Sequence, residues 1–162
     1  MNRVIVIGCP GAGKSTFARR LRDKTGLPLY YLDMLWNRAD RTTVSAEEFD
    51  GELEKILNGE KWIIDGNYLR TMPARLEACD TVFFLDYPLA LCLESARARI
   101  GTAREDLPWV EQEFDEEFRQ WILDFPETQL PEIRRLLQLD GPGRSVHIFK
   151  NRDDADCFLA CL

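Results

Sequence analysis

The sequence predicts an α/β fold in which helices pack against a largely parallel β-sheet. Strand-like and helical segments alternate along the 162 residues, which is the pattern of repeated strand–helix–strand units. The strand-like segments are continuous apolar runs, as expected for strands that are buried on both faces of a sheet. The length and the hydrophobic content of 45% suit one domain with a substantial core, so we expect a single domain over residues 1–162.

The first half of the chain predicts strands at 3–7, 29–32 and 62–64. A helix is expected over 16–24, because apolar residues recur on one face and Gly26 provides a stop signal. The segment Ser45-Ala-Glu-Glu48 is a capping box that opens a second helix, which Asn58-Gly59 ends. Asp33 and Asp65 directly follow the second and third strands.

The second half predicts strands at 81–85 and 146–149. Pro88 suits the first turn of a helix that runs to about Ile100. Apolar residues between Val110 and Phe125 recur at helical spacing and predict a further helix, followed by a break that Pro126 and Pro131 flank. Another helix is expected over 133–137, and a short helix after the last strand. The acidic residues 111–117 are interpreted as the solvated face of their helix.

The segment between the first strand and the first helix reads Gly8-Cys9-Pro10-Gly11-Ala12-Gly13-Lys14-Ser15, which fits the pattern G-x-x-x-x-G-K-[ST]. Glycines let the backbone curl so that successive N–H groups point at phosphate oxygens, and the helix N-terminus adds partial positive charge. The alternative is a turn with an unrelated lysine, which the flanking strand and helix disfavour. We therefore expect a nucleoside triphosphate to bind through Gly8, Pro10, Gly11, Ala12, Gly13, Lys14, Ser15 and Thr16.

Aspartates follow three of the strands, at the sheet edge where parallel α/β folds bind ligands. Asp65 and the Ser15 hydroxyl are the candidates to hold Mg²⁺, with Asp65 acting through water. Asp33 is the candidate to orient or deprotonate an acceptor hydroxyl. The structural alternatives are a turn cap for Asp65 and a helix N-cap for Asp33. For Asp86 we favour a structural cap.

Phosphoryl transfer requires positive charge around the migrating group, and arginines gather after the fourth strand. Arg97, Arg99 and Arg104 lie at or beyond the end of the predicted helix. We expect a short lid at about 99–108, with Arg104, helped by Arg99 or Arg97, over the transferring phosphate. The alternative is that these arginines complement the helix dipole.

The segment at about 33–60 is the expected acceptor-binding region. Charged and aromatic residues in or near it are candidates to contact an anionic or aromatic part of the acceptor: Tyr31, Trp36, Arg38, Arg41, Tyr68 and Arg70.

Composition excludes several classes of function. The net charge of −7 and the lack of a basic run argue against direct nucleic-acid binding. No apolar stretch approaches the length that spans a bilayer, and no signal peptide is evident, so we expect a cytoplasmic protein. Five scattered cysteines argue against a disulfide framework. Both a monomer and a homodimer remain open.

These motifs resemble the adenylate-kinase-like P-loop small-molecule kinases, and within them a bacterial group called DNA topology modulation proteins. The shared residues are the glycine loop, Leu32-Asp33-x-Leu35-Trp36, Trp62-Ile63-Ile64-Asp65-Gly66-Asn67-Tyr68, Phe84-Leu85-Asp86-Tyr87-Pro88 and Trp121-Ile-Leu-Asp-Phe125-Pro126. The resemblance implies a three-layer α/β/α fold whose five parallel strands have the order 2-3-1-4-5. It also implies ATP and Mg²⁺, with adenine contacts from Lys150 to Arg152.

The resemblance further implies that Asp65 matches the aspartate of the Asp-Gly-x-Pro-Arg motif of nucleotide kinases. The chain departs from that motif, because Asn67-Tyr68-Leu69-Arg70 places the arginine one position late. The predicted function is transfer of the γ-phosphate of ATP to a small acceptor: a nucleotide, a nucleoside or a polar metabolite. The alternative is a regulatory nucleotide-binding protein with slow hydrolysis only.

Overall fold

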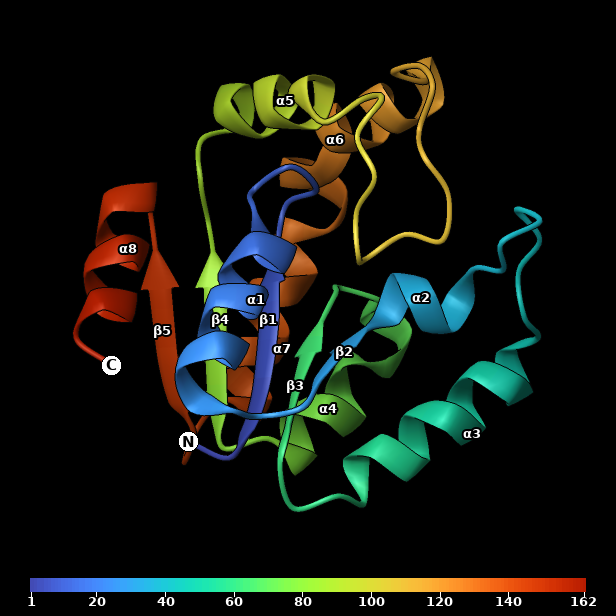
Figure 1. The fold of residues 1–162 in the computed structure, drawn as a ribbon. Helices are drawn as coiled ribbons and strands as arrows, with labels where there is room; N and C mark the ends of the chain where they lie inside the picture. Colours follow the sequence, from blue (N-terminus) through green and yellow to red (C-terminus); the bar gives the residue numbers. More distant parts are fainter.

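A parallel five-stranded sheet forms the centre of the molecule (Figure 1). The structure is a computed structural model and describes residues 1–162. The strands are β1 (Arg3–Gly8), β2 (Leu29–Tyr31), β3 (Trp62–Asp65), β4 (Thr81–Leu85) and β5 (Ser145–Phe149). Their order is β2-β3-β1-β4-β5, and every neighbouring pair is parallel. The predicted fold class and strand order are confirmed.

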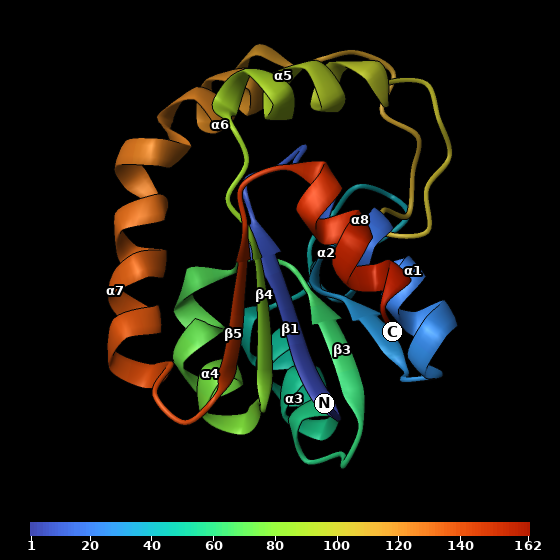
Figure 2. The same cartoon turned by 90° about the vertical axis from the view of Figure 1, so that its left-hand side faces the viewer.

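Helices form a layer on each face of this sheet, and two more lie across its carboxyl edge (Figure 2). Helices α1 (Lys14–Thr25) and α8 (Arg152–Ala160) cover one face, and α4 (Met72–Ala78) and α7 (Leu130–Asp140) cover the other. Helices α5 (Leu89–Ala98) and α6 (Glu116–Thr128) lie above the strand ends. The remaining helices are α2 (Leu32–Trp36), α3 (Ala46–Leu57) and the 3₁₀ turn η1 (Leu69–Thr71). None of these helices has the length and apolar composition that a bilayer span requires.

An aromatic cluster fixes α1 on the sheet. The Phe17 ring lies 5.0 Å from that of Phe83 and 5.8 Å from that of Phe149, measured between ring centroids. Phe17 and Phe83 are almost completely buried, and burial of one such side chain stabilises a fold by roughly 1.5–3 kcal/mol. Because Phe17 belongs to the first turn of α1, this packing also fixes the loop between β1 and α1.

The sequence signals that predicted where helices begin and end are mostly confirmed. Ser45 accepts a hydrogen bond from the Glu48 backbone N–H at 3.1 Å, as a capping box requires. Gly26 adopts the left-handed conformation, with φ 69°, at the end of α1. The break between α6 and α7 lies at Gln129, between Pro126 and Pro131.

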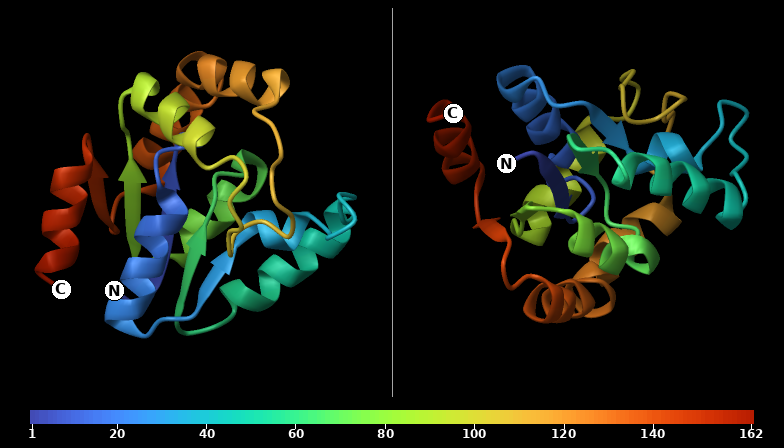
Figure 3. Two further views of the ribbon diagram at one scale, coloured as in Figure 1. Left: turned by 45° about the horizontal axis from the view of Figure 1, so that its top comes forward. Right: turned by 90° about the horizontal axis from the view of Figure 1, so that it is seen from below.

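Two predicted boundaries are wrong. Strand β2 ends at Tyr31, and Leu32 and Asp33 instead form the start of α2. The helix that was expected from about Val110 begins at Glu116, where the Asp115 side chain caps it by accepting from the Glu117 N–H. Residues 99–115 therefore form one long irregular loop, the lid loop, which arches over the carboxyl edge of the sheet (Figure 3).

Candidate active site

The loop over residues 8–15 has a backbone that requires glycine at two positions. Gly8 has φ 149°, and a Cβ there would lie 2.4 Å from the Leu85 carbonyl oxygen. Gly11 has φ 85°, and its Cβ would lie 2.0 Å from the Cys92 carbonyl oxygen. Both contacts are shorter than any side chain tolerates, and both conformations favour glycine. The loop thus passes against the neighbouring strand and against α5 without space for a side chain.

The start of α1 has the properties of an anion-binding site. The backbone N–H groups of residues 13–16 donate to no backbone carbonyl, and the first turn of α1 contains no acidic residue. Such unpaired N–H groups together with the helix dipole favour negative charge. The Lys14 ammonium donates to the Cys9 carbonyl at 3.2 Å and so lies folded over the loop. Ala12, by contrast, has a structural role in the loop, because it is buried and donates its N–H to the Cys9 carbonyl. Gly8 likewise has a structural role.

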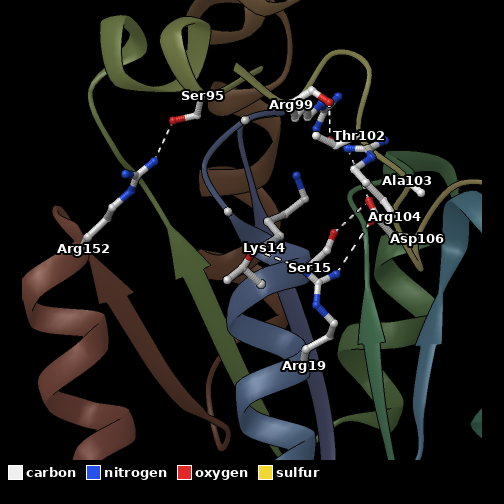
Figure 4. Close-up of a pocket in the computed structure, with 13 residues that line it drawn as sticks. Lys14, Ser15, Arg19, Ser95, Arg99, Thr102, Ala103, Arg104, Asp106 and Arg152 are labelled. Carbon is white, nitrogen blue, oxygen red and sulfur yellow. Dashed lines mark hydrogen bonds and ion pairs between the residues drawn. The ribbon is translucent and has the colours of Figure 1, made fainter. Parts of the chain in front are cut away.

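A cavity of about 370 Å³ adjoins this loop, and we call it the donor cavity (Figure 4). Its lining includes the predicted residues Gly11, Gly13, Lys14, Ser15, Thr16, Arg99, Arg104 and Arg152. Figure 4 shows the lid arginines above Lys14 and Ser15, and Arg152 on the opposite side, where it donates to the Ser95 hydroxyl at 2.6 Å. The structure therefore brings the predicted phosphate loop and the predicted arginines to the same cavity.

Carboxylates of the lid loop partner its arginines. Arg104 lies 3.4 Å from Glu111 and 3.6 Å from Asp106, and Arg99 lies 3.3 Å from Glu111. Burial is the main influence on Arg99 and lowers its guanidinium pKa. Glu111 was predicted to belong to a solvated helix face; that prediction is wrong, because Glu111 lies in the lid loop and pairs with both arginines.

Asp106 is a site residue that the sequence did not indicate. It is only 6% exposed, and its Oδ2 accepts a hydrogen bond from the Ser15 hydroxyl at 3.2 Å. Arg19 on α1 lies 3.8 Å from its Oδ1. Asp106 thus holds the lid loop against the phosphate loop through a contact to the predicted magnesium-binding serine.

Asp65 ends β3 and is 4% exposed. Its Oδ1 is buried without any hydrogen-bond partner, which is costly for a carboxylate. Desolvation raises the Asp65 pKa to about 6, against the opposing charge of Lys14 and a favourable interaction with Ser15. No three acidic, histidine or cysteine side chains gather closely enough to hold a metal by themselves. Mg²⁺ at phosphate sites takes one or two carboxylates, water and phosphate oxygens, and an unpartnered buried carboxylate beside a serine fits that donor set.

A second cavity, of about 110 Å³, also adjoins Lys14, and we call it the acceptor cavity after the predicted role of Asp33 in its lining. Its lining includes Asp33 and Asp65, together with aromatic residues of β2, of the segment after β3 and of α6. The Tyr68 hydroxyl donates to Asp33 Oδ1 at 2.8 Å, which leaves the other carboxylate oxygen available. Four residues line both cavities: Lys14, Ser15, Arg99 and Asp106.

The segment after β3 is clamped by two side chains that the sequence analysis did not assign to the site. The Asn67 amide accepts from the Gly8 N–H at 3.0 Å and donates to the Gly8 carbonyl at 2.8 Å. The fully buried Arg75 donates to the carbonyls of Gly66 at 2.8 Å, Tyr68 at 3.0 Å and Asn67. Tyr68 has φ 38°, a strained conformation for a tyrosine. Arg75 therefore offsets strain in the backbone that joins Asp65 to Tyr68.

Several residues near the predicted acceptor segment point elsewhere. Arg38 pairs with Glu48 at 2.9 Å, and Arg70 forms a bidentate pair with Asp50 at 2.7 and 2.8 Å. Neither arginine lines the acceptor cavity. The predicted structural cap by Asp86 is wrong, because α5 has Pro88 at its N-cap and no side-chain cap. Asp86 instead accepts from Lys150 and from Arg134, and Lys150 does not line the donor cavity.

Comparison with known proteins identifies relatives of the fold. No family model matches the sequence. The chain is 34% identical over 103 residues to an adenylate kinase of Allorhizobium ampelinum; the match covers 60% of this chain and only 45% of that protein. The structure resembles a shikimate kinase of Acinetobacter baumannii solved with shikimate, with a TM-score of 0.63 and 18% identity over 99% of this chain and 92% of that one.

Two further solved structures share the architecture. A shikimate kinase of Bacteroides thetaiotaomicron gives a TM-score of 0.62 at 18% identity, covering 99% of this chain and 95% of that one. A sugar kinase of a Janibacter species gives 0.57 at 15% identity, covering 99% and 91%. The chain thus has the parallel α/β fold of P-loop small-molecule kinases and, over part of its length, sequence similarity to an adenylate kinase.

Proposed function

We propose that the protein transfers the γ-phosphate of ATP to a hydroxyl group of a small acceptor, with Mg²⁺ as cofactor. The observation that carries this proposal is the meeting of the two cavities at Lys14, Ser15, Arg99 and Asp106. A nucleotide in the donor cavity would present its terminal phosphate at that junction, where an acceptor in the second cavity could reach it. Phosphoryl transfer requires the two substrates to meet in this way.

The phosphate loop binds the donor. The N–H groups at the start of α1 and the Lys14 ammonium hold the β- and γ-phosphates. Ser15 and Asp65 hold Mg²⁺, which supplies charge neutralisation and orientation of the phosphates when bound. Ser15 would have to give up its hydrogen bond to Asp106 to bind the metal, and Arg99 and Arg104 would have to give up their pairing with Glu111 to face phosphate. Arg152 lines the same cavity on the side away from the lid arginines (Figure 4) and would contact the nucleoside part.

The acceptor side supplies a proton acceptor. Asp33 Oδ1 is occupied by the Tyr68 hydroxyl, so Oδ2 orients the acceptor hydroxyl and takes its proton. The acceptor oxygen forms a bond to the γ-phosphorus while the bond from that phosphorus to the β–γ bridging oxygen breaks, and ADP leaves. Arg104 and Arg99 neutralise the charge that spreads over the transferring group.

The test measures ADP release by the purified protein with Mg²⁺ and ATP, alone and with a panel of nucleosides, nucleotides and sugars. We expect at least one acceptor to raise the rate above the acceptor-free rate, and Lys14→Met to abolish the increase. Lys24→Met is the matched control, because Lys24 is an exposed lysine of the same helix and lies outside both cavities. If hydrolysis without an acceptor is the only activity, the protein is a regulatory nucleotide-binding protein instead.

The resemblance to DNA topology modulation proteins remains a prediction. The net charge of −7 disfavours direct binding of duplex DNA, which depends on release of counterions by basic residues. Salt-sensitive retention of the protein on duplex DNA would contradict this part of the proposal.

A further inference from the structure

Three arginines of the segments after β2 and β3 are already engaged by groups within the protein. Arg38 and Arg70 are each paired with an aspartate or glutamate on α3. Arg75 is completely buried, and its guanidinium is used by backbone carbonyls. Recognition of a phosphate or carboxylate normally uses a free arginine that makes charge-assisted bonds to it, and none of these three arginines is available for that purpose.

The lining of the acceptor cavity carries three carboxylates, of Asp33, Asp65 and Asp106, and two cations, Lys14 and Arg99. Asp106 is paired with Arg104 and Arg19, whereas Asp33 and Asp65 make no ion pair within the protein. Both cations also line the donor cavity, where the triphosphate of ATP would engage them. An anionic group on the acceptor would therefore face Asp33 with no positive charge reserved for it, and like charges at short range repel strongly in a partly buried site.

Aromatic rings also contribute to the lining of this cavity. Tyr31, Tyr68, Phe118 and Trp121 all line it. Trp121 is 46% exposed, which is unusual for so large an apolar side chain, and its ring lies 6.2 Å from that of Phe118. Exposed aromatic faces beside a cavity favour flat ligands that stack on them.

Resting on the phosphotransferase activity proposed above, we propose that the acceptor is an uncharged alcohol with a flat ring, of the chemical class of nucleosides, and is not a nucleoside monophosphate. Asp33 binds the reacting hydroxyl, and the aromatic wall formed by Phe118 and Trp121 stacks on the ring. Arg38 and Arg70 are paired with α3, and Arg41, the third candidate arginine, does not line the cavity, so none of the three is placed to bind a phosphate on the acceptor.

The experiment uses matched pairs that differ only in the phosphate: adenosine, guanosine, cytidine and thymidine, each against its 5′-monophosphate. Binding is measured by calorimetry on the full chain saturated with Mg²⁺ and a non-hydrolysable ATP analogue. We expect at least one nucleoside to bind at least tenfold more tightly than its monophosphate. Trp121→Ala should weaken that nucleoside about tenfold, since stacking of one base contributes about 1–3 kcal/mol. Leu139→Ala, which alters an exposed residue of α7 outside the cavity, should leave it unchanged.

Removal of the Asp33 charge gives a second readout. Asp33→Asn should narrow the ratio between nucleoside and monophosphate affinities by severalfold, because the repulsion of the phosphate is lost. Equal or tighter binding of the monophosphates by the wild-type protein, or binding of none of the eight compounds, would overturn the inference. Failure of the ATP analogue itself to bind would instead overturn the proposed function, so the two failures are distinguishable.

Discussion

Replacement of Asp65 by asparagine should make the metal-free protein more stable and inactive at the same time. Asp65 is a buried carboxylate with one oxygen unpartnered, a feature that lowers stability and that selection for folding alone would remove. Asparagine has nearly the same shape and carries no charge. If Asp65 serves to hold Mg²⁺ near the phosphates, the substitution relieves the cost in the empty protein and removes the function.

The magnitude follows from the Asp65 pKa, which burial raises from an ordinary 3.8 to about 6. The folded state therefore binds the Asp65 proton more tightly than the unfolded state does. The contribution of this proton to the free energy of unfolding is fully present below about pH 4 and is lost as the pH rises through 6. At pH 7 the difference corresponds to about 3 kcal/mol. Because the asparagine amide also loses hydration on burial, we expect Asp65→Asn to gain about 1–3 kcal/mol there, or roughly 3–10 °C in Tm.

The assay is chemical denaturation at several pH values between 4 and 8, in the presence of a chelator, together with ADP release at pH 7.5. The stability difference between variant and wild type should grow between pH 4 and pH 7, while turnover falls about 100-fold or more. Asp86→Asn is the matched control at the end of β4: it loses ionic contacts to Lys150 and Arg134, so it should cost up to about 1 kcal/mol. Unchanged stability of Asp65→Asn at every pH, with turnover retained, would refute the reasoning.

Three further predictions concern the phosphate loop. Gly11→Ala should lower stability by at least about 2 kcal/mol in a denaturant titration, because its Cβ would lie 2.0 Å from the Cys92 carbonyl at φ 85°; a wild-type midpoint would contradict the loop geometry. Asn67→Leu should cost roughly 1–3 kcal/mol and weaken ATP binding, because both backbone groups of Gly8 lose their partner; unaltered thermal unfolding would exclude this clamp. Lys14→Met should lower kcat/KM at least about 100-fold with little change in Tm, because its only hydrogen bond is to a loop carbonyl; comparable turnover by the variant would remove Lys14 from the mechanism.

The fold and the phosphate loop could be predicted because their signals are local. The glycines, Lys14 and the flanking strand and helix lie within a few residues of one another, and each is tied to its conformation by short-range sterics and hydrogen bonding. The strand runs are equally local, and the resemblance implied their order. Local signals were less reliable where a strand passes directly into a helix. The apolar run from Leu29 continues into Leu32, which is completely buried in α2. No change in the spacing of apolar residues therefore marks the end of the strand.

The rest of the site depends on contacts between distant parts of the chain. Asp106 meets Ser15 across 91 residues of sequence, and the lid loop that carries it has no periodic pattern to place it. The role of Arg75 follows from the three carbonyls that surround it, which nothing in its own helix indicates. The pairing of Arg38 and Arg70 with α3 likewise appears only in three dimensions, and it changes the expected charge of the acceptor.

Titration calorimetry of the purified protein with a non-hydrolysable ATP analogue and Mg²⁺ most directly tests whether the cavity above Lys14 binds the phosphate donor. We predict one site per chain, with binding weakened when Mg²⁺ is omitted and lost in Lys14→Met. Absence of any heat from folded protein, or equal binding by wild type and Lys14→Met, would contradict the account.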